Sequence, residues 1–430
     1  MGNNEQKFYG WYMVAVLWII YLINLGFPLY GGAVINSFMI KDIPMDRMTY
    51  GAGFSLTNLF VGLGAIPAGM AVMKYGIRKT FAMGAVILVI GTVWLSQVAT
   101  QPWHYLIGFG VLNGFGMAMG TMLPLATTVT RWFVRYRGRA MAIAMTASGF
   151  AGFIASPAIN KFIQATGGNW RLAWLCVTAA CIIAGIVAFM FIKERPQDYG
   201  QIPDGREATE AEKAAAAANP LYTKYAWTPA EAYKTAAYWL TVVAAACSQW
   251  PFFFFTAHWI MHLRGKGINP ADAAFAMGIF TMGGIAGRLI SGWLMDRIPA
   301  RFVMMLGLCC YFVGSFLALQ ASPSTLTVVY IAAACYGAGF GWCFVAQQTM
   351  LGHFFGPAAF PKLNGNLLAI SAVLVSGAGI VGGRLFDIFK GYNEAFYLNV
   401  AMGVLGIVLL IFTTMPKAPN ASDSAPSIKA

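Results

Sequence analysis

Charged side chains are scarce in this sequence: they make up 10% of its 430 residues, whereas hydrophobic residues make up 59%. An ordinary soluble domain carries roughly 25% charged residues. Too little polar surface is therefore available to coat a water-soluble globule of this size, which excludes a soluble enzyme, a disordered protein and a secreted disulfide scaffold. Because the apolar runs far exceed the ~9–11 residues of a barrel strand, we expect an all-α membrane protein.

Metal-binding and acid–base groups are equally restricted. The seven cysteines lie inside apolar runs without a CxxC pair, which favours buried, reduced thiols over disulfides or metal ligands. All fifteen acidic residues fall in loops, tails or the ends of apolar runs. The lack of a carboxylate in mid-membrane argues against a membrane-embedded hydrolase and against a carboxylate proton relay. We expect no enzyme activity, no metal site and no cofactor.

Hydropathy over a window of about 19 residues predicts twelve transmembrane helices. They cover 10–39, 50–73, 80–98, 104–131, 139–163, 171–192, 236–263, 271–295, 302–320, 325–354, 363–386 and 393–414. The first run is far longer than the ~7–15-residue apolar region of a cleaved signal peptide. The domains expected from this pattern are an N-terminal six-helix bundle at 1–192, a cytoplasmic linker at 193–235, a C-terminal six-helix bundle at 236–414 and a cytoplasmic tail at 415–430.

The lysines and arginines indicate the orientation of the chain. Most of them fall on the cytoplasmic side if both termini are cytoplasmic, as the positive-inside rule requires. The net charge of +13 therefore reflects topology and gives no indication of a nucleic-acid partner. We expect a monomer in the lipid bilayer of the cytoplasmic (inner) membrane.

The two halves of the sequence repeat one pattern. The second predicted helix runs into GMAVMKYGIRK at 69–79, and the eighth runs into GWLMDRIPAR at 292–301. Both turns resemble the loop signature G-x-x-x-D-R-x-G-x-R-R of the major facilitator superfamily. The second copy keeps Asp296 and Arg297, whereas the first has Met73 in place of the acid. This resemblance implies two pseudo-symmetric six-helix bundles with a site near the midplane between them.

Arg288 is a cation inside a predicted transmembrane helix. Its spacing from Asp296 places it roughly 12 Å from the cytoplasmic end, near the middle of a ~30 Å hydrocarbon layer. A lone arginine there costs at least ~2.5–3.5 kcal/mol, so it should face a cavity and have a partner. Because no acid lies within the membrane, we predict that a substrate anion is this partner, held by the planar guanidinium fork. The alternative is an arginine that snorkels or caps neighbouring carbonyl groups.

His258 and His262 stand one turn apart in the helix predicted at 236–263. Without a third ligand nearby in sequence, the pair does not indicate a metal site. Polar or interfacial positions are the ordinary alternative for both. His258 is also a candidate for proton exchange, because the unperturbed pKa of histidine is near 6.5.

The region 335–387 carries a closer resemblance in its F-G-W core, F-G-P loop and G-R-L-x-D ending. It resembles the monocarboxylate transporters and their bacterial relatives, the oxalate/formate antiporters. The resemblance implies that Arg288 binds the substrate carboxylate, and His258 matches a histidine common in the bacterial branch. Aromatic positions that line the related oxalate site are matched by Phe150, Phe340 and Phe344, although each is equally compatible with plain helix packing.

Departures from the family pattern narrow the expected substrate. Ser371 stands where oxalate transporters carry a second cation, so a monocarboxylate is expected in preference to a dicarboxylate. Leu29 and Gly284 stand where animal monocarboxylate transporters place a lysine and an aspartate. Those two residues belong to the animal proton-coupling scheme, so the resemblance leaves the mode of coupling open.

These observations predict a secondary active transporter of small monocarboxylates such as lactate or pyruvate, working by rocking of its two halves. Arg288 is expected to hold the carboxylate, Phe340 and Phe344 to pack its apolar body, and Leu29 to shape the opposite wall. Symport with a proton, with His258 as the titrating group, is one form of this prediction. The alternatives are an oxalate/formate-type anion exchanger and a transporter-like membrane receptor.

Overall fold

The computed structural model describes residues 8–133, 136–205, 223, 225–295 and 297–418. The first half contains α1 (Gly10–Leu25), η1 (Gly26–Gly31), α2 (Gly32–Met39), α3 (Arg47–Tyr75), α4 (Ile77–Val93), η2 (Trp94–Val98), α5 (Pro102–Tyr105), η3 (Leu106–Leu112), α6 (Asn113–Gly120), α7 (Met122–Trp132), α8 (Arg137–Ala165) and α9 (Trp170–Phe191). The short elements η4 (Pro196–Tyr199), η5 (Pro203–Gly205) and α11 (Pro229–Ala232) follow. The second half contains α12 (Ala236–Gly265), α13 (Pro270–Met295), α14 (Ala300–Leu319), α15 (Leu326–Val375), α16 (Ala378–Phe389) and α17 (Asn393–Phe412).

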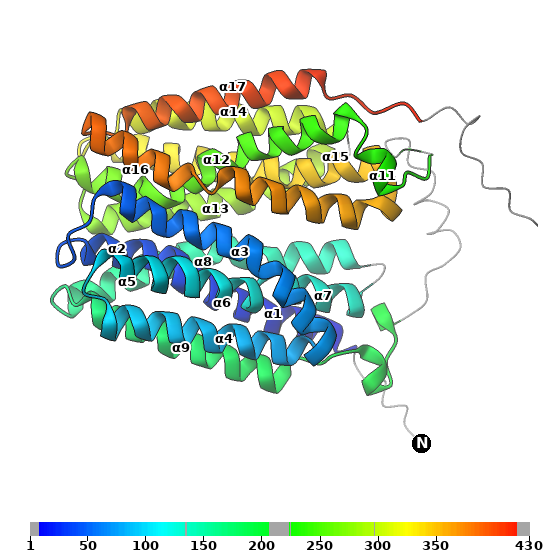
Figure 1. Ribbon diagram of the computed structural model, residues 1–430, viewed down its shortest axis with the longest axis horizontal. Coiled ribbons are helices and arrows are strands. Elements are labelled where there is room, and N and C mark those ends of the chain that lie inside the picture. The colour runs from blue at the N-terminus through cyan, green and yellow to red at the C-terminus, as the bar shows by residue number, and fades with distance from the viewer. Residues whose placement is uncertain (1–7, 134–135, 206–222, 224, 296, 419–430) are drawn as a thin grey trace, which may run out of the picture.

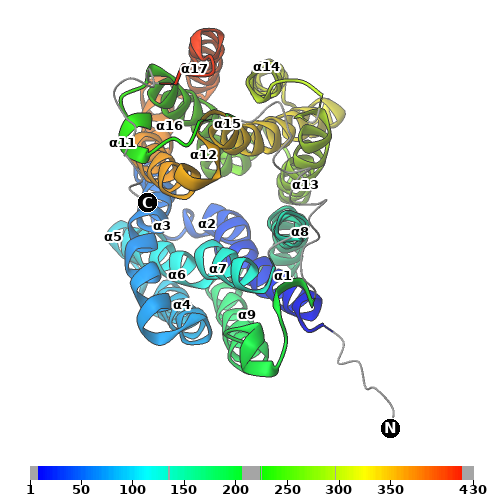
Figure 2. The same cartoon turned by 90° about the vertical axis from the view of Figure 1, so that its right-hand side faces the viewer.

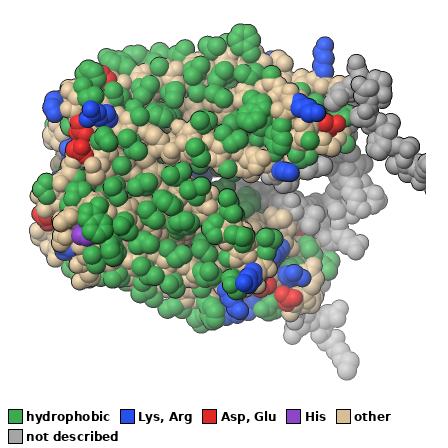
Figure 3. Space-filling model, viewed as in Figure 1, with side chains coloured by type: hydrophobic (Ala, Val, Ile, Leu, Met, Phe, Trp, Pro, Cys, Tyr) green, Lys and Arg blue, Asp and Glu red, His purple; other side chains and the backbone are tan. Residues whose placement is uncertain are grey.

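Twelve helical runs within the described residues are long and apolar enough to cross a membrane. This confirms the predicted all-α membrane protein with twelve spans. Large apolar side chains cover the outside of these runs; Ile66 is 67% exposed and Phe412 is 69% exposed. Figure 3 shows hydrophobic side chains along the flank of both halves, with charged side chains gathered toward the two ends. Such a surface suits lipid and would be unfavourable in water.

The helices form two groups that face each other (Figures 1 and 2). One group contains α1 to α9 and the other contains α12 to α17. The start of α1 and the end of α17 lie at the same end of the molecule, called here the terminal end, and the opposite end is called the distal end. Part of the predicted linker (206–222 and 224) and most of the predicted tail (419–430) lie outside the described residues. The domain boundaries at 193 and 235 therefore stay a prediction.

Several membrane-spanning runs are interrupted where the sequence weakens the helical hydrogen-bond ladder. Pro28 has no N–H group and lies in η1, a π-helical turn that also carries Leu29 and Tyr30. Thr121, with φ −134° and ψ −113°, separates α6 from α7. At Gly356, α15 breaks with φ 72°, a backbone conformation that glycine adopts without steric cost. The first two interruptions present side chains to the space between the two groups of helices.

A carboxylate from a distant segment holds the loop between α3 and α4. Met73, which replaces the acid of the loop signature, is 80% exposed. Glu194 instead accepts hydrogen bonds from the first two N–H groups of α4, each at 2.9 Å, and pairs with Arg131 at 3.3 Å. Glu194, which follows α9 in the chain, thus supplies the negative charge that the first copy of the signature lacks. Asp296, the acid of the second copy, lies outside the described residues.

The two halves meet at the distal end along α3 and α16, a contact called here the distal seam. A Cβ atom on Gly51 would clash with the carbonyl group of Gly379, and one on Gly383 would clash with the backbone of Arg47. The Asp387 carboxylate accepts hydrogen bonds from the first two N–H groups of α3, at 3.2 and 3.0 Å. Because a helix leaves its first N–H groups without internal partners, Asp387 satisfies α3 from the other half. The distal end is therefore closed by backbone contact.

A branched side chain at Gly51 should force the distal seam apart. We expect Gly51→Val to cost the closed arrangement about 1–3 kcal/mol of overpacking, a shift of roughly 5- to 150-fold toward the open one. Gly69→Val on the same helix is the matched control, because a Cβ there meets nothing within 4 Å. Hydrogen–deuterium exchange at the start of α3 should rise in Gly51→Val and not in Gly69→Val. Equal exchange in both variants would contradict the importance of this contact.

Candidate functional site

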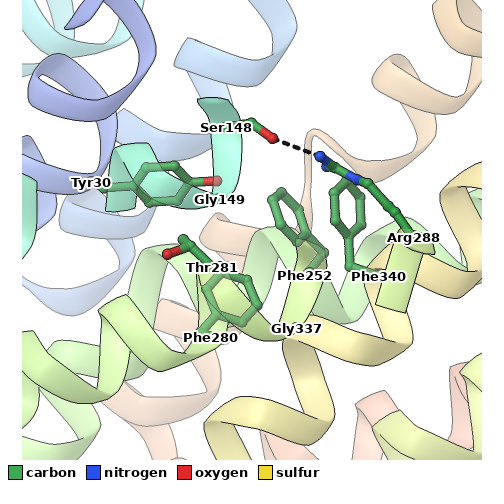
Figure 4. Close-up of a pocket in the computed structure, with 10 residues that line it drawn as sticks. Tyr30, Ser148, Gly149, Phe252, Phe280, Thr281, Arg288, Gly337 and Phe340 are labelled. Atoms are coloured by element: carbon green, nitrogen blue, oxygen red, sulfur yellow. Dashed lines mark hydrogen bonds between the residues drawn. The ribbon is translucent and has the colours of Figure 1, made fainter. Parts of the chain in front are cut away.

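A cavity of about 190 Å³ lies between the two halves. Its lining residues come from α1, η1, α3, α6, α7 and α8 in the first half and from α12, α13 and α15 in the second. A neighbouring cavity of about 10 Å³ shares Tyr30, Ser148, Phe252, Arg288 and Phe340 with it (Figure 4). Figure 3 shows a hollow between the halves toward the terminal end. The site is therefore created by the pairing of the two halves.

Arg288 projects from α13 into this cavity. Its Nη1 atom donates to the Ser148 hydroxyl at 2.6 Å and to the Met145 carbonyl at 3.1 Å, both on α8 of the other half (Figure 4). Its Nε atom is buried without a hydrogen-bond partner in the described part of the chain. No carboxylate among the described residues pairs with it. The arginine thus caps a carbonyl group, as the alternative interpretation expects, and keeps donor capacity for an anion.

Aromatic rings surround the guanidinium group. Its Cζ atom lies 5.6 Å from the ring centroid of Phe340 and 5.8 Å from that of Phe344. Phe340 stacks on Phe252 with centroids 3.8 Å apart. Leu29, on η1, lines the same cavity from the first half. The structure therefore brings four residues named from the sequence, Arg288, Phe340, Phe344 and Leu29, to one cavity.

His258 lies on α12 but not among the residues that line the cavity. Its Nε2 atom is 2.8 Å from the Gly379 carbonyl oxygen, and its Nδ1 atom is 3.1 Å from the Tyr392 hydroxyl. Because a carbonyl can only accept, we assign Nε2 as a donor and the Tyr392 hydroxyl as the donor to Nδ1. His258 thus lies behind the distal seam, bonded to the residue against which Gly51 packs. Its role in transport stays a prediction.

Phe150 and Ser371 also lie outside the cavity lining. Phe150 packs against Trp18, with ring centroids 5.6 Å apart. Ser371 is fully buried on α15, and its hydroxyl has no hydrogen-bond partner within the described ranges. The substrate roles of both residues stay predictions.

Tyr21 and Tyr30 line the cavity and were not expected from the sequence. Neither hydroxyl has a hydrogen-bond partner among the described residues. In Figure 4 the Tyr30 hydroxyl points toward Gly149, close to Ser148. Tyrosines in an apolar helix are ordinarily packing residues. The signal that could have identified Tyr30 is Pro28, because it favours the π-helical turn that carries the next two side chains.

The lining of the cavity carries a single positive charge within the described residues. Arg288 is the one charged side chain among the described residues that line it. No group of three or more His, Cys, Asp or Glu side chains suited to a metal ion occurs in the described part of the chain. The arrangement can bind one negative charge next to an apolar body.

Comparison with known proteins agrees with this architecture. The family model described as "Major Facilitator Superfamily" matches residues 8–266 and 261–430. A solved structure of a bacterial homolog of the human lysosomal transporter Spinster, in an inward-facing and occupied conformation, superposes with a TM-score of 0.73 at 17% identity. The match covers 95% of this chain and 97% of that one, and it supports the fold.

Curated relatives with similar sequences are transporters. Monocarboxylate transporter 13 of Bos taurus is 26% identical over 359 residues, covering 81% of this chain and 76% of the relative. The gallate transporter of Pseudomonas putida is 26% identical over 390 residues, covering 84% of this chain and 81% of the relative. The resemblance drawn from the motifs is thereby confirmed.

Replacing Arg288 by lysine should expose the importance of its geometry. Lysine keeps the charge but loses the planar fork, so we expect Arg288→Lys to weaken the binding of a small carboxylate anion, with lactate as the probe, by about ten- to hundredfold. Isothermal titration of the purified protein measures this. Arg171→Lys is a control, because Arg171 lies outside the cavity lining and donates to the carbonyl groups of Ser96 in η2 and of Ala99 directly after it. Wild-type affinity in Arg288→Ala would refute the assigned role.

Proposed function

Because this chain belongs to the Major Facilitator Superfamily, we propose that it is a secondary active transporter of small monocarboxylates of the lactate and pyruvate type. The observation that carries the proposal is Arg288, a cation in the cavity between the halves for which no described residue supplies a carboxylate. The relatives named monocarboxylate transporters support the same substrate class.

The substrate carboxylate would bind at the junction of the two halves. Arg288 comes from the second half and already donates to α8 of the first. An anion bound by Arg288 can also accept hydrogen bonds from the Tyr21 and Tyr30 hydroxyls, both on the first half. Phe340 and Phe344 would pack against its apolar body. Binding then links the two halves, which is what a rocking mechanism needs.

The orientation in the membrane is part of the proposal. The distribution of lysine and arginine supports a cytoplasmic location for both termini. The membrane we propose is the inner membrane of the cell. In that orientation the closed distal seam faces outward and the hollow at the terminal end faces the cytoplasm. We propose that the arrangement described here is the inward-facing one.

Uptake of labelled lactate into proteoliposomes tests the proposed function. Wild type should accumulate the label in exchange for, or together with, another ion, and Arg288→Ala should not. A transporter-like receptor would bind lactate without uptake. Counterflow that requires a preloaded anion would favour an oxalate/formate-type exchanger.

Selectivity provides a second test, based on the single cation of the cavity. A second carboxylate would enter without a partner, at an effective cost of several kcal/mol. Wild type should therefore bind lactate more tightly than oxalate, and Ser371→Lys should shift the preference toward oxalate. Competition of each acid against labelled lactate measures the preference. Tighter binding of oxalate by the wild type would contradict the one-cation argument.

We also propose that lactate uptake is coupled to protons through His258. Its position behind the distal seam means that separation of Gly51 from Gly379 would open a path from outside to the imidazole. A second ring proton would sit on Nδ1, where the Tyr392 hydroxyl can rotate to accept it. Alternating access would then apply to the proton as well as to the carboxylate.

An imposed pH step tests this coupling. An inward proton gradient should raise lactate accumulation in wild type, and His258→Gln should remove that response. His262→Gln is the matched control, because His262 lies one turn further along α12 and contacts the Ala318 carbonyl at 3.0 Å. Lactate accumulation in wild type that does not depend on the proton gradient would contradict symport. An unchanged pH response in His258→Gln would contradict the role of His258 in coupling.

A further inference from the structure

The central cavity has hydrogen-bonding groups on two different contacts between the halves. Arg288 belongs to the contact between α8 and α13. Asn58, on α3, also lines the cavity, and its Nδ2 atom donates to the Ala372 carbonyl oxygen of α15 at 3.3 Å. Figure 2 shows α8 and α13 on one side of the molecule and α3 and α16 on the other. A cation and an amide therefore face the cavity from opposite sides.

The walls between these two groups are mostly apolar and aromatic. They include Leu29, Phe54, Met117, Met145, Phe253 and Phe340. The cavity volume of about 190 Å³ exceeds the roughly 150 Å³ of an engineered apolar cavity that binds benzene. A three-carbon acid bound to Arg288 would leave most of the apolar surface of these walls in contact with water, whereas an aromatic ring would bury it.

Asn58 offers the cavity a hydrogen-bond acceptor. Since its Nδ2 atom donates to a carbonyl, its Oδ1 atom is left to accept. The threonines of the lining give their hydroxyl hydrogens to backbone carbonyl groups: Thr57 to Gly53 and Phe109, Thr121 to Met117, and Thr256 to Phe252. Those threonine oxygens keep lone pairs that can also accept. Asn58 is the one amide among the described lining residues, and its free Oδ1 acceptor lies on the α3 side of the cavity, across from Arg288.

We propose that the substrates of this transporter include aromatic monocarboxylates with a ring hydroxyl remote from the carboxylate, and that Asn58 determines specificity for that hydroxyl. The inference rests on the proposed function, because it places the carboxylate at Arg288. The ring packs between Phe340 and the methionine and leucine side chains, and the hydroxyl donates to Asn58 Oδ1. A site that holds a polar group for a substrate hydroxyl discriminates against analogues that lack it.

Affinities of wild type for lactate, benzoate, 3-hydroxybenzoate and 4-hydroxybenzoate test the proposal, measured by titration and by competition against lactate uptake. We expect at least one hydroxybenzoate to bind about three- to tenfold more tightly than benzoate, the range of one net hydrogen bond. In Asn58→Leu this ratio should fall to about one. In the control Thr241→Val, on α12 but outside the cavity lining, the lost hydroxyl bonds only its own helix, so the ratio should persist.

The outcomes separate this inference from the proposed function. Uptake of lactate without competition by any of the aromatic acids would overturn the inference and leave the proposed function standing. Failure of wild type to take up any carboxylate would overturn the proposed function itself. A hydroxybenzoate preference that survives in Asn58→Leu would overturn the role of Asn58. If Asn58→Leu does not fold, Asn58→Ser, which shortens the acceptor, must lower the ratio, and an unchanged ratio there counts against Asn58 in the same way.

Discussion

The charge of Arg288, which no carboxylate of the described residues balances, is the main physical constraint on the contact between the two halves. A cation at membrane depth is costly unless it faces a cavity and is hydrogen-bonded, and here both conditions are met at a contact between α13 and α8. Ser148 and Met145 satisfy part of the guanidinium group, while its Nε atom has no partner in the described part of the chain. The halves are therefore joined by a group that an anion can also engage, so occupancy of the cavity and the pairing of the halves act on the same side chain.

The distal seam complements this polar contact with a different kind of interaction. Gly51 and Gly379 allow two helix backbones to approach closely, and Asp387 satisfies the exposed N-terminal N–H groups of α3 from the opposite half. These contacts depend on close fit and alignment, so separation of α3 from α16 would weaken both of them. The glycine contact is the more sensitive of the two, because close packing of backbones tolerates little displacement, whereas the partly exposed Asp387 carboxylate can also be hydrated.

The sequence predicted the site unevenly, and the reason differs from residue to residue. Arg288 was predictable because a charge in an apolar helix has few acceptable environments. Phe340, Phe344 and Leu29 were named from a family resemblance, and all line the cavity. Aromatic and polar side chains in helices carry no such constraint: Phe150 packs on Trp18, and His258 is bonded within its own half. Tyr21 and Asn58 reach the cavity without a distinguishing pattern in sequence, and Tyr30 is marked only by the π-helical turn that Pro28 favours.

The sequence by itself determined the fold class, the twelve spans and the presence of a cation that needs a partner, because hydropathy and charge act locally along each helix. Only the tertiary structure decided which side chains share the cavity, because that depends on helix rotation and on the π-helical turn at η1. The tertiary structure also decided that Glu194 supplies the carboxylate that Met73 lacks, and that Asp387 accepts hydrogen bonds from the first N–H groups of α3. These partners are far apart in sequence, and the packing of the helices alone brings them together.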